Sequence, residues 1–270
     1  FDYSGDRYGF TAGYLVVEDN FNPEIGFKRR DNFKEFDGAL RFSPRITSSE
    51  RIRRLVFEAD TESYWSADKD ELETRAHELS FTTEFEEGDQ FNLSIRDEFE
   101  MLSKAFRIAP NVILKPGDYN FKSYAASYRW GTQRRFSGSL SLRGGDFWNG
   151  KNTAIGFSSG RIELSPQLSV EPSYSYNQIE LPEGDFRTEL GRVRVTYTLS
   201  PRMYFSGLMQ YNSTQSSLST NFRFRWEWAP GSEIFVVYSD DRDTNPFDRP
   251  DSFELRNRGW AIKINRLFQI

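Results

Sequence analysis

Cysteine is absent from this chain, histidine occurs once, and no run of 18 or more apolar residues is present. A helical membrane span needs about 20 predominantly apolar residues, so the sequence excludes helical membrane proteins. The lack of cysteine excludes disulfide scaffolds, thiol catalysis and cysteine-based zinc sites. A single histidine removes most histidine-based metal and triad chemistry. We therefore expect no metal site and no cofactor.

A strong charge of one sign is also missing. The 270 residues include 35 Lys and Arg against 40 Asp and Glu, a formal net charge of −5. Both signs are spread along the chain, which argues against a nucleic-acid-binding protein. Aromatic residues, in contrast, make up 16% of the chain, while the whole hydrophobic set reaches only 37%. Such a chain must place its rings without a large aliphatic core.

Hydrophobicity alternates with a period of two along most of the chain. In residues 216–228, Leu218, Phe222 and Trp226 fall on one face and Arg223 on the other. This alternation predicts strands with one apolar and one polar face. Strands in soluble domains average about 5–6 residues, whereas a tilted membrane strand needs about 9–11. The same test predicts fourteen mostly long strands, near 5–17, 33–43, 51–64, 73–86, 90–100, 119–131, 135–145, 151–164, 167–179, 186–199, 202–212, 216–228, 232–240 and 256–270.

The connections between these strands alternate in character. Every second one is short and rich in turn residues, often Ser-Pro, and Pro favours a tight turn. These short turns are 42–45, 86–89, 131–134, 164–167, 199–202 and 229–232. The others are longer and polar, at 18–32, 65–72, 101–118, 146–150, 180–185, 213–215 and 241–255. Short turns at one end and long loops at the other are typical of outer-membrane barrels.

Aromatic residues gather near both ends of the predicted strands, as in the interfacial girdles of a membrane barrel. The alternative is a soluble sandwich with aromatic cross-strand pairs. Near the short turns lie Phe42, Phe85, Phe91, Trp130, Phe136, Tyr197, Phe205, Trp226, Trp228 and Phe268. Near the long loops lie Tyr14, Tyr64, Trp65, Tyr119, Phe147, Trp148, Tyr174, Phe186, Tyr211, Tyr238 and Trp260.

Three stretches carry a family resemblance: residues 217–243, the GDFWNG segment at 145–150, and the ending IKINRLFQI. Together they resemble the C-terminal barrel domain, of unassigned function, that follows a family-9-like carbohydrate-binding domain in many Gram-negative proteins. The resemblance implies an outer-membrane barrel and supplies no catalytic residues. The ending also resembles the assembly signal of such barrels, although Ile270 stands where a terminal Phe is usual.

We therefore predict an all-β fold, a transmembrane antiparallel barrel of about 14 strands with short periplasmic turns and long extracellular loops. Residues 1–270 are expected to form a single domain in the outer membrane of a Gram-negative bacterium. The start, Phe1-Asp2-Tyr3, has no initiator Met, basic residues or apolar run, so we expect the chain to begin inside a longer or processed protein.

Two segments depart from the pattern. Pro172 interrupts a regular strand and predicts a bulge. Residues 101–114 are too apolar for a solvated loop, and are expected to plug the lumen, cover a barrel rim or contact another chain. The candidate plug residues are Met101, Leu102, Phe106, Ile108, Val112, Ile113 and Leu114.

Charged residues are expected to line the lumen, because each would cost a few kcal/mol on the lipid face at mid-membrane. Arg192 and Arg194 with Arg223 and Arg225 could form a basic stripe that attracts anions. The favoured interpretation is instead a salt-bridged wall, because unpaired charges in a narrow interior are costly. The lumen set is Arg54, Glu58, Asp60, Arg192, Arg194, Arg223, Arg225, Glu227 and Lys263, with Glu58, Asp60 and Glu227 as the counter-charges.

Two other constellations are weak. His77 shares the parity of Leu79 and Phe81, which places it on the outward face without an oriented nucleophile, so no catalytic residue is expected. Residues 241–245 begin like a calcium loop, but Pro246 replaces the required Gly and Ser252 the required Glu.

Three functions follow from this fold. The leading hypothesis is a pore or transport barrel for saccharides or other small solutes, where the sugar comes only from the resemblance. The second is a plugged barrel that anchors an upstream domain or docks a partner complex, and the least favoured is an outer-membrane hydrolase using His77. The expected partners are outer-membrane lipid and lipopolysaccharide, the barrel-assembly machinery through the C-terminal strand, and protein partners in a complex, but no nucleic acid.

Overall fold

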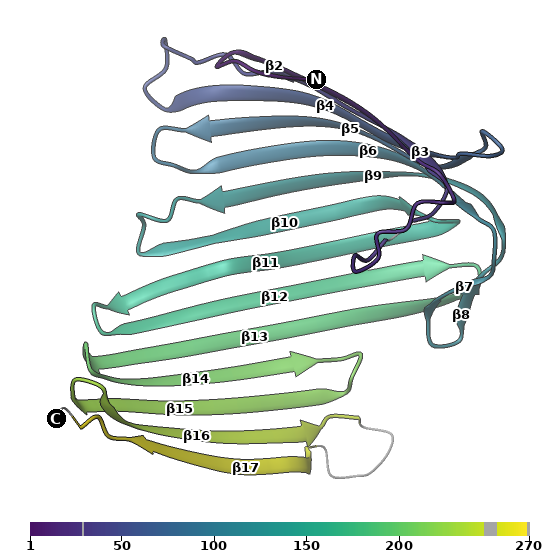
Figure 1. Ribbon diagram of the computed structural model, residues 1–270. Helices are drawn as coiled ribbons and strands as arrows, with labels where there is room; N and C mark the ends of the chain where they lie inside the picture. The colour runs from purple at the N-terminus through teal and green to yellow at the C-terminus, as the bar shows by residue number, and fades with distance from the viewer. Residues whose placement is uncertain (29, 246–252, 269–270) are drawn as a thin grey trace. The chain divides into compact units, whose positions relative to one another are not determined.

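The computed structural model describes residues 1–28, 30–245 and 253–268, and its regular elements there are all β-strands (Figure 1). Fifteen strands follow one another in an antiparallel meander, and a separate two-stranded hairpin is inserted after the sixth. No described helix is long and apolar enough to cross a membrane. The meander contains β1 (Asp2–Ser4), β2 (Tyr8–Val17), β3 (Phe33–Phe42), β4 (Ile52–Ser66), β5 (Leu72–Phe85), β6 (Gln90–Leu102), β9 (Gly117–Trp130), β10 (Phe136–Phe147), β11 (Gly150–Ser165), β12 (Leu168–Leu181), β13 (Gly184–Ser200), β14 (Met203–Asn212), β15 (Ser217–Ala229), β16 (Ser232–Asp243) and β17 (Glu254–Asn265), and the hairpin is β7 (Phe106–Ala109) with β8 (Val112–Leu114).

Each of the fourteen predicted strands corresponds to a strand of the sheet, but the count needs correction to fifteen. The segment predicted as one strand at 5–17 begins with a turn, so that β1 folds back on β2 and pairs Tyr3 with Phe10. Gly5 closes this turn by donating its backbone N–H to the carbonyl of Tyr8 at 3.0 Å. β1 and β17 are the end strands of the meander, and no described pairing closes it into a barrel.

Two compact units divide the chain. The first contains residues 1–128, 141–154 and 178–186, and the second contains 129–140, 155–177 and 187–270. Strands β9 to β13 contribute residues to both units.

In the first unit, strict alternation gives β2–β6 an apolar face and a polar face. Phe42, Phe57 and Phe81 stand opposite one another on β3, β4 and β5, with ring centroids 6.2 and 5.0 Å apart. The next position along β5 toward the long loops on this face, Leu79, is 61% exposed. On the other face the register pairs Glu58 with Ser80. The rings therefore pack against one another across neighbouring strands and leave an exposed apolar surface.

The second unit repeats this arrangement in β14–β17. Phe222, Tyr238 and Trp260 are in register on β15, β16 and β17, with ring centroids 6.3 and 4.6 Å apart. Phe222 is 55% exposed and Trp260 is 69% exposed. Aromatic cross-strand pairs are thus present, as the soluble sandwich alternative predicted. However, within each unit the described residues form no second sheet that packs on these rings, as a β-sandwich would require.

The connections follow the predicted alternation only in part. β2 ends at Val17 and β3 begins only at Phe33, so this connection is long as expected, but β10 and β11 are joined by residues 148–149 and β12 and β13 by residues 182–183. The strands extend into both predicted loops because apolar residues there are packed rather than solvated, as described below. Conversely, the turn expected at 42–45 is longer and occupies residues 43–51.

Polar contacts hold the β1–β2 turn against the end of β3. Ser43 is 1% exposed, and its hydroxyl donates to the carbonyl of Asp6 at 2.8 Å. Arg41 donates to the carbonyl of Gly5 at 2.6 Å, and Arg45 forms an ion pair with Asp6 at 2.8 Å. The hydrogen bond from Arg45 lowers the pKa of Asp6 below its ordinary value. β1 is thereby fixed along part of the free edge of β2.

Candidate functional site

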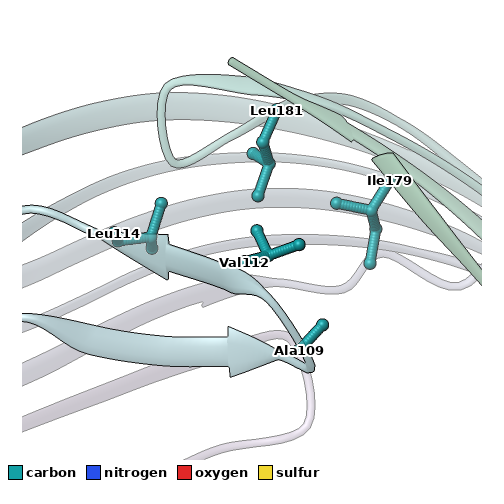
Figure 2. Packing of buried hydrophobic residues seen from close by; sticks show 5 residues of the cluster. All are labelled: Ala109, Val112, Leu114, Ile179 and Leu181. Carbon is teal, nitrogen blue, oxygen red and sulfur yellow. The ribbon is translucent and has the colours of Figure 1, made fainter. Parts of the chain in front are cut away.

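The hairpin β7–β8 carries the best-packed apolar cluster of the first unit. Leu114 is fully buried, and Val112 and Ala109 are nearly so. Their side chains pack against Ile179 and Leu181 at the end of β12. Figure 2 shows Val112 and Leu114 on the hairpin facing Ile179 and Leu181 on the strand. The hairpin is therefore docked on the sheet and is not a solvated loop, which confirms the expectation from its composition.

Leu102 identifies the face on which the hairpin lies. This residue is partly buried against the hairpin cluster. It ends β6 and has the same parity as Glu100, Glu98 and Arg96, which lie on the polar face opposite Thr74, Ala76 and Glu78. Because alternate side chains of a strand point to the same face, the hairpin covers the polar face of the first unit at the end nearest the long loops.

Aromatic rings complete the surface on which the hairpin packs. Trp148, in the turn between β10 and β11, lies 6.0 Å from Phe106, 5.3 Å from Tyr119 and 5.7 Å from Phe121, measured between ring centroids. Trp148 has a φ of 54°, a left-handed conformation that costs about 1–2 kcal/mol for a residue with a side chain. The ring contacts offset this cost and fix the short turn.

The seven predicted plug residues do not form one group. Met101 and Leu102 belong to β6 and point to opposite faces of it. In the hairpin, Val112 and Leu114 are buried and Ile108 is partly buried, whereas Phe106 and Ile113 are exposed. The structure thus brings Leu102, Ile108, Val112 and Leu114 together over the polar face and leaves Met101 outside the group.

Acidic residues dominate the polar face of β3–β6 in the first unit. Glu84 is 8% exposed and accepts from Arg53 at 2.8 Å and Arg54 at 2.6 Å. Arg96 lies 3.3 Å from Glu78 and 3.1 Å from Glu98. By the observed register this face has the cations Arg41, Arg54 and Arg96 and the carboxylates Glu35, Asp37, Glu58, Asp60, Glu62, Glu78, Glu84, Glu98 and Glu100.

The predicted counter-charges in the first unit are wrong. Within the described residues, Glu58 and Asp60 form no ion pair, and Arg54 binds Glu84 instead. The reason is the register, because Glu84 stands directly opposite Arg54 on the neighbouring strand. The register between two strands cannot be read from the alternation of one strand alone.

Basic residues are more prominent on the polar face of the second unit. Arg225 lies 2.6 Å from Glu233 and 3.7 Å from Glu227, so Glu227 is a counter-charge as predicted. Arg194 comes no closer than 3.9 Å to a carboxylate, that of Glu171. Within the described residues, Arg192, Arg223 and Lys263 form no ion pair. The salt-bridged wall is therefore incomplete in this unit.

One ion cluster was not anticipated from the sequence. Asp240 is 6% exposed, although it has the parity of Tyr238 on the apolar face. Arg242 lies 2.6 Å from its carboxylate and Arg258 lies 3.0 Å from it. Alternation in the sequence predicts the face on which each residue lies, but the register between β16 and β17, which places Arg258 opposite Asp240, cannot be read from it.

Neither His77 nor the loop at 241–245 lies in an arrangement of described residues that would form a catalytic or calcium site. His77 is exposed on the apolar face, opposite Thr61 and Asp97. In the loop at 241–245, Asp243 accepts hydrogen bonds from the backbone of Asn245 and from Arg256, while Pro246 and Ser252 lie outside the described residues. Among the residues that the structure describes, no group of three or more metal-binding side chains converges.

The sequence was compared with models of known protein families and with curated proteins. No family model matches the chain, and no curated protein matches it significantly. The resemblance to an outer-membrane barrel domain therefore stays a prediction.

The docking of the hairpin depends on Leu114. Replacing Leu114 with Ala should remove a fully buried side chain and cost about 2–4 kcal/mol in local stability, releasing the hairpin without unfolding the strands. The matched control is Ile113→Ala, because this neighbour is 44% exposed and points away from the cluster. Limited trypsin digestion would follow cleavage at Lys104, Arg107 and Lys115, which should accelerate in the Leu114 variant alone. Equal rates in both variants would contradict a docked hairpin.

Proposed function

We propose that this chain is a transmembrane β-barrel of a Gram-negative outer membrane that acts as a pore or transporter for saccharides or other small solutes. One observation carries the proposal: in both units a sheet of long strands has an exposed apolar, aromatic face and a charged opposite face. A soluble protein rarely exposes such a large apolar surface. In a barrel this face contacts lipid and the charged face lines the lumen.

The strand lengths support the same environment. Apart from β1 and the hairpin strands, every described strand has 10 to 17 residues. A tilted strand needs about 9–11 residues to cross the hydrocarbon core. Each long strand is therefore sufficient for one crossing.

Closure would occur between β2 and β17. Fourteen long strands remain when the three-residue β1 is set aside, and bacterial single-chain barrels have an even number of strands. β1 and the preceding Phe1 cover Gly9 to Ala12 of the β2 edge, and residues 13–17 would remain for pairing with β17. Eight strands leave a filled interior and sixteen to eighteen leave an aqueous channel, so a fourteen-stranded lumen would be of intermediate width.

The hairpin determines how far such a lumen is open. Since β7–β8 packs on the polar face, it would lie inside the barrel near the extracellular loops and narrow it. This same observation favours the second candidate function, a plugged barrel that anchors another domain or docks a partner complex. Lipopolysaccharide and the barrel-assembly machinery are the partners that an outer-membrane location would imply.

Single-channel conductance in a planar bilayer tests the pore. The intact chain should conduct in steady steps, and replacing residues 104–115 with a short Gly-Ser linker should raise the conductance, because the packed hairpin is removed and β6 is kept. Current from the linker variant alone would support the plugged barrel. Silence of both proteins after confirmed insertion would reject the pore.

Orientation of the two faces can be tested at adjacent residues of β5. Leu79→Arg places a charge on the apolar face and should cost about 2–4 kcal/mol on insertion near the bilayer midplane, lowering the folded fraction in lipid vesicles. Ser80→Arg, on the polar face, is the matched control and should insert like the unmodified chain. The measurement is the folded fraction on unheated gels, and equal losses in both variants would argue against a lipid-facing surface.

Barrel closure can be tested with disulfides because the chain has no Cys of its own. Ala261→Cys on β17 should crosslink within one molecule to at least one of Gly13→Cys, Leu15→Cys or Val17→Cys on β2, all on the polar face and beyond the part of the β2 edge that β1 covers. Asp37→Cys, opposite Gly13 on β3, is the control and should not react with Ala261→Cys. Oxidation followed by non-reducing gels would report the bond. Crosslinks only between molecules would contradict closure.

A further inference from the structure

We infer that the polar face of the second unit carries a binding site for polyanionic solutes, formed by Arg192, Arg194 and Arg223 and called here the arginine stripe. The inference deepens the proposed function, on which it rests, by naming a class of solute. It concerns molecules that carry two or more phosphate, sulfate or carboxylate groups.

The register of three strands brings the arginine stripe together. Arg194 on β13 stands opposite Leu208 on β14, and Leu208 stands opposite Asn221 on β15. Arg223 is two residues along β15 from Asn221 and has the same parity. Arg192 is two residues along β13 from Arg194. The three side chains therefore rise from one face along a diagonal that crosses β14.

The spacing suits a ligand with several anionic groups. β13 and β15 are two strand spacings apart, about 9–10 Å, and residues of the same parity along one strand are about 6.6 Å apart. Arginine side chains are long enough to close part of these gaps, so two guanidinium groups can converge on one anion or hold two neighbouring ones.

The stripe differs in its pairing from three other arginines on β15, β16 and β17. Arg225, Arg242 and Arg258 each lie within 3.0 Å of a carboxylate oxygen. Within the part of the chain that the structure describes, Arg192 and Arg223 form no ion pair, and Arg194 approaches Glu171 only to 3.9 Å. The stripe is thus a local excess of positive charge.

Arg223 is held in position without being neutralised. Its Nε donates to the side-chain oxygen of Asn221 at 2.9 Å, and the amide nitrogen of Asn221 donates to the hydroxyl of Ser239 at 2.9 Å. This chain of hydrogen bonds fixes the plane of the guanidinium group. The two terminal nitrogens keep their donors for a ligand, and such a fork matches phosphate or carboxylate oxygens.

The uncompensated charge has a cost that a ligand would remove. Three neighbouring cations repel one another, and a narrow interior screens them less than bulk water does. Gln210, opposite Arg192, and Ser206, opposite both Thr196 and Arg223, provide polar neighbours but no countercharge. A bound polyanion would supply the missing negative charge.

Calorimetric titration of the full chain in detergent with inorganic tripolyphosphate tests the site. The unmodified chain should bind, and the double variant Arg192→Gln with Arg223→Gln should bind at least 10-fold more weakly, because two donor forks and two charges are lost. The control is a double variant with the same charge change away from the stripe, Arg202→Gln with Arg187→Gln. It should bind like the unmodified chain, and unheated gels would establish that all three proteins are folded.

Two results would overturn the inference: no binding to the unmodified chain, or equal weakening in both double variants, which would indicate a general charge effect. The assay does not require current, so binding by a chain that is silent in bilayers would keep the site and reject the pore. Conductance without binding would do the reverse.

Discussion

Strict pairing of backbone groups between neighbouring strands is the constraint on which the rest of this structure depends. Once each strand gives its N–H and C=O groups to the strands beside it, its side chains alternate between two surfaces. The alternation along β5 places Leu79 on the exposed apolar face and its neighbour Ser80 on the charged face. Where each surface should lie then follows from its chemistry, since rings need an apolar environment and carboxylates need water or partners.

The hairpin breaks the uniform polarity of one surface. At the end of the first unit nearest the long loops, Leu102, Ile179 and Leu181 replace charged side chains on the polar side, and β8 covers them. This patch is apolar because it is buried by the chain itself. The apolar side chains that made residues 101–114 unsuitable for a solvated loop therefore pack against the sheet. The residues that they contact lie at the ends of β10, β12 and β13, which explains why these strands extend into regions that the sequence predicted as loops.

Period-two patterning was sufficient to predict fourteen of the fifteen strands of the sheet and their two faces, because alternation is a local property. The ion pairs were less predictable, since they depend on register between strands. Arg54 binds Glu84 because Glu84 stands directly opposite it on β5. The separation of β1 from β2 was missed because the turn at Gly5 interrupts a pattern that otherwise continues. The residues on which the hairpin packs could not be predicted at all, since Leu114 and Ile179 are 65 residues apart in the chain.

That separation has a consequence for the order in which the molecule is built. The meander itself can grow by adding one neighbouring strand at a time, with short loops to close. The hairpin, however, follows β6 directly and cannot make its contacts with Ile179 and Leu181 until β12 has joined the sheet. Docking of the hairpin therefore closes a long segment of chain, which is entropically costly. Assembly intermediates with fewer strands would therefore keep their polar surface uncovered and hydrated. The covering of that surface is then an event that waits for β12, while β13 to β17 can still be added afterwards.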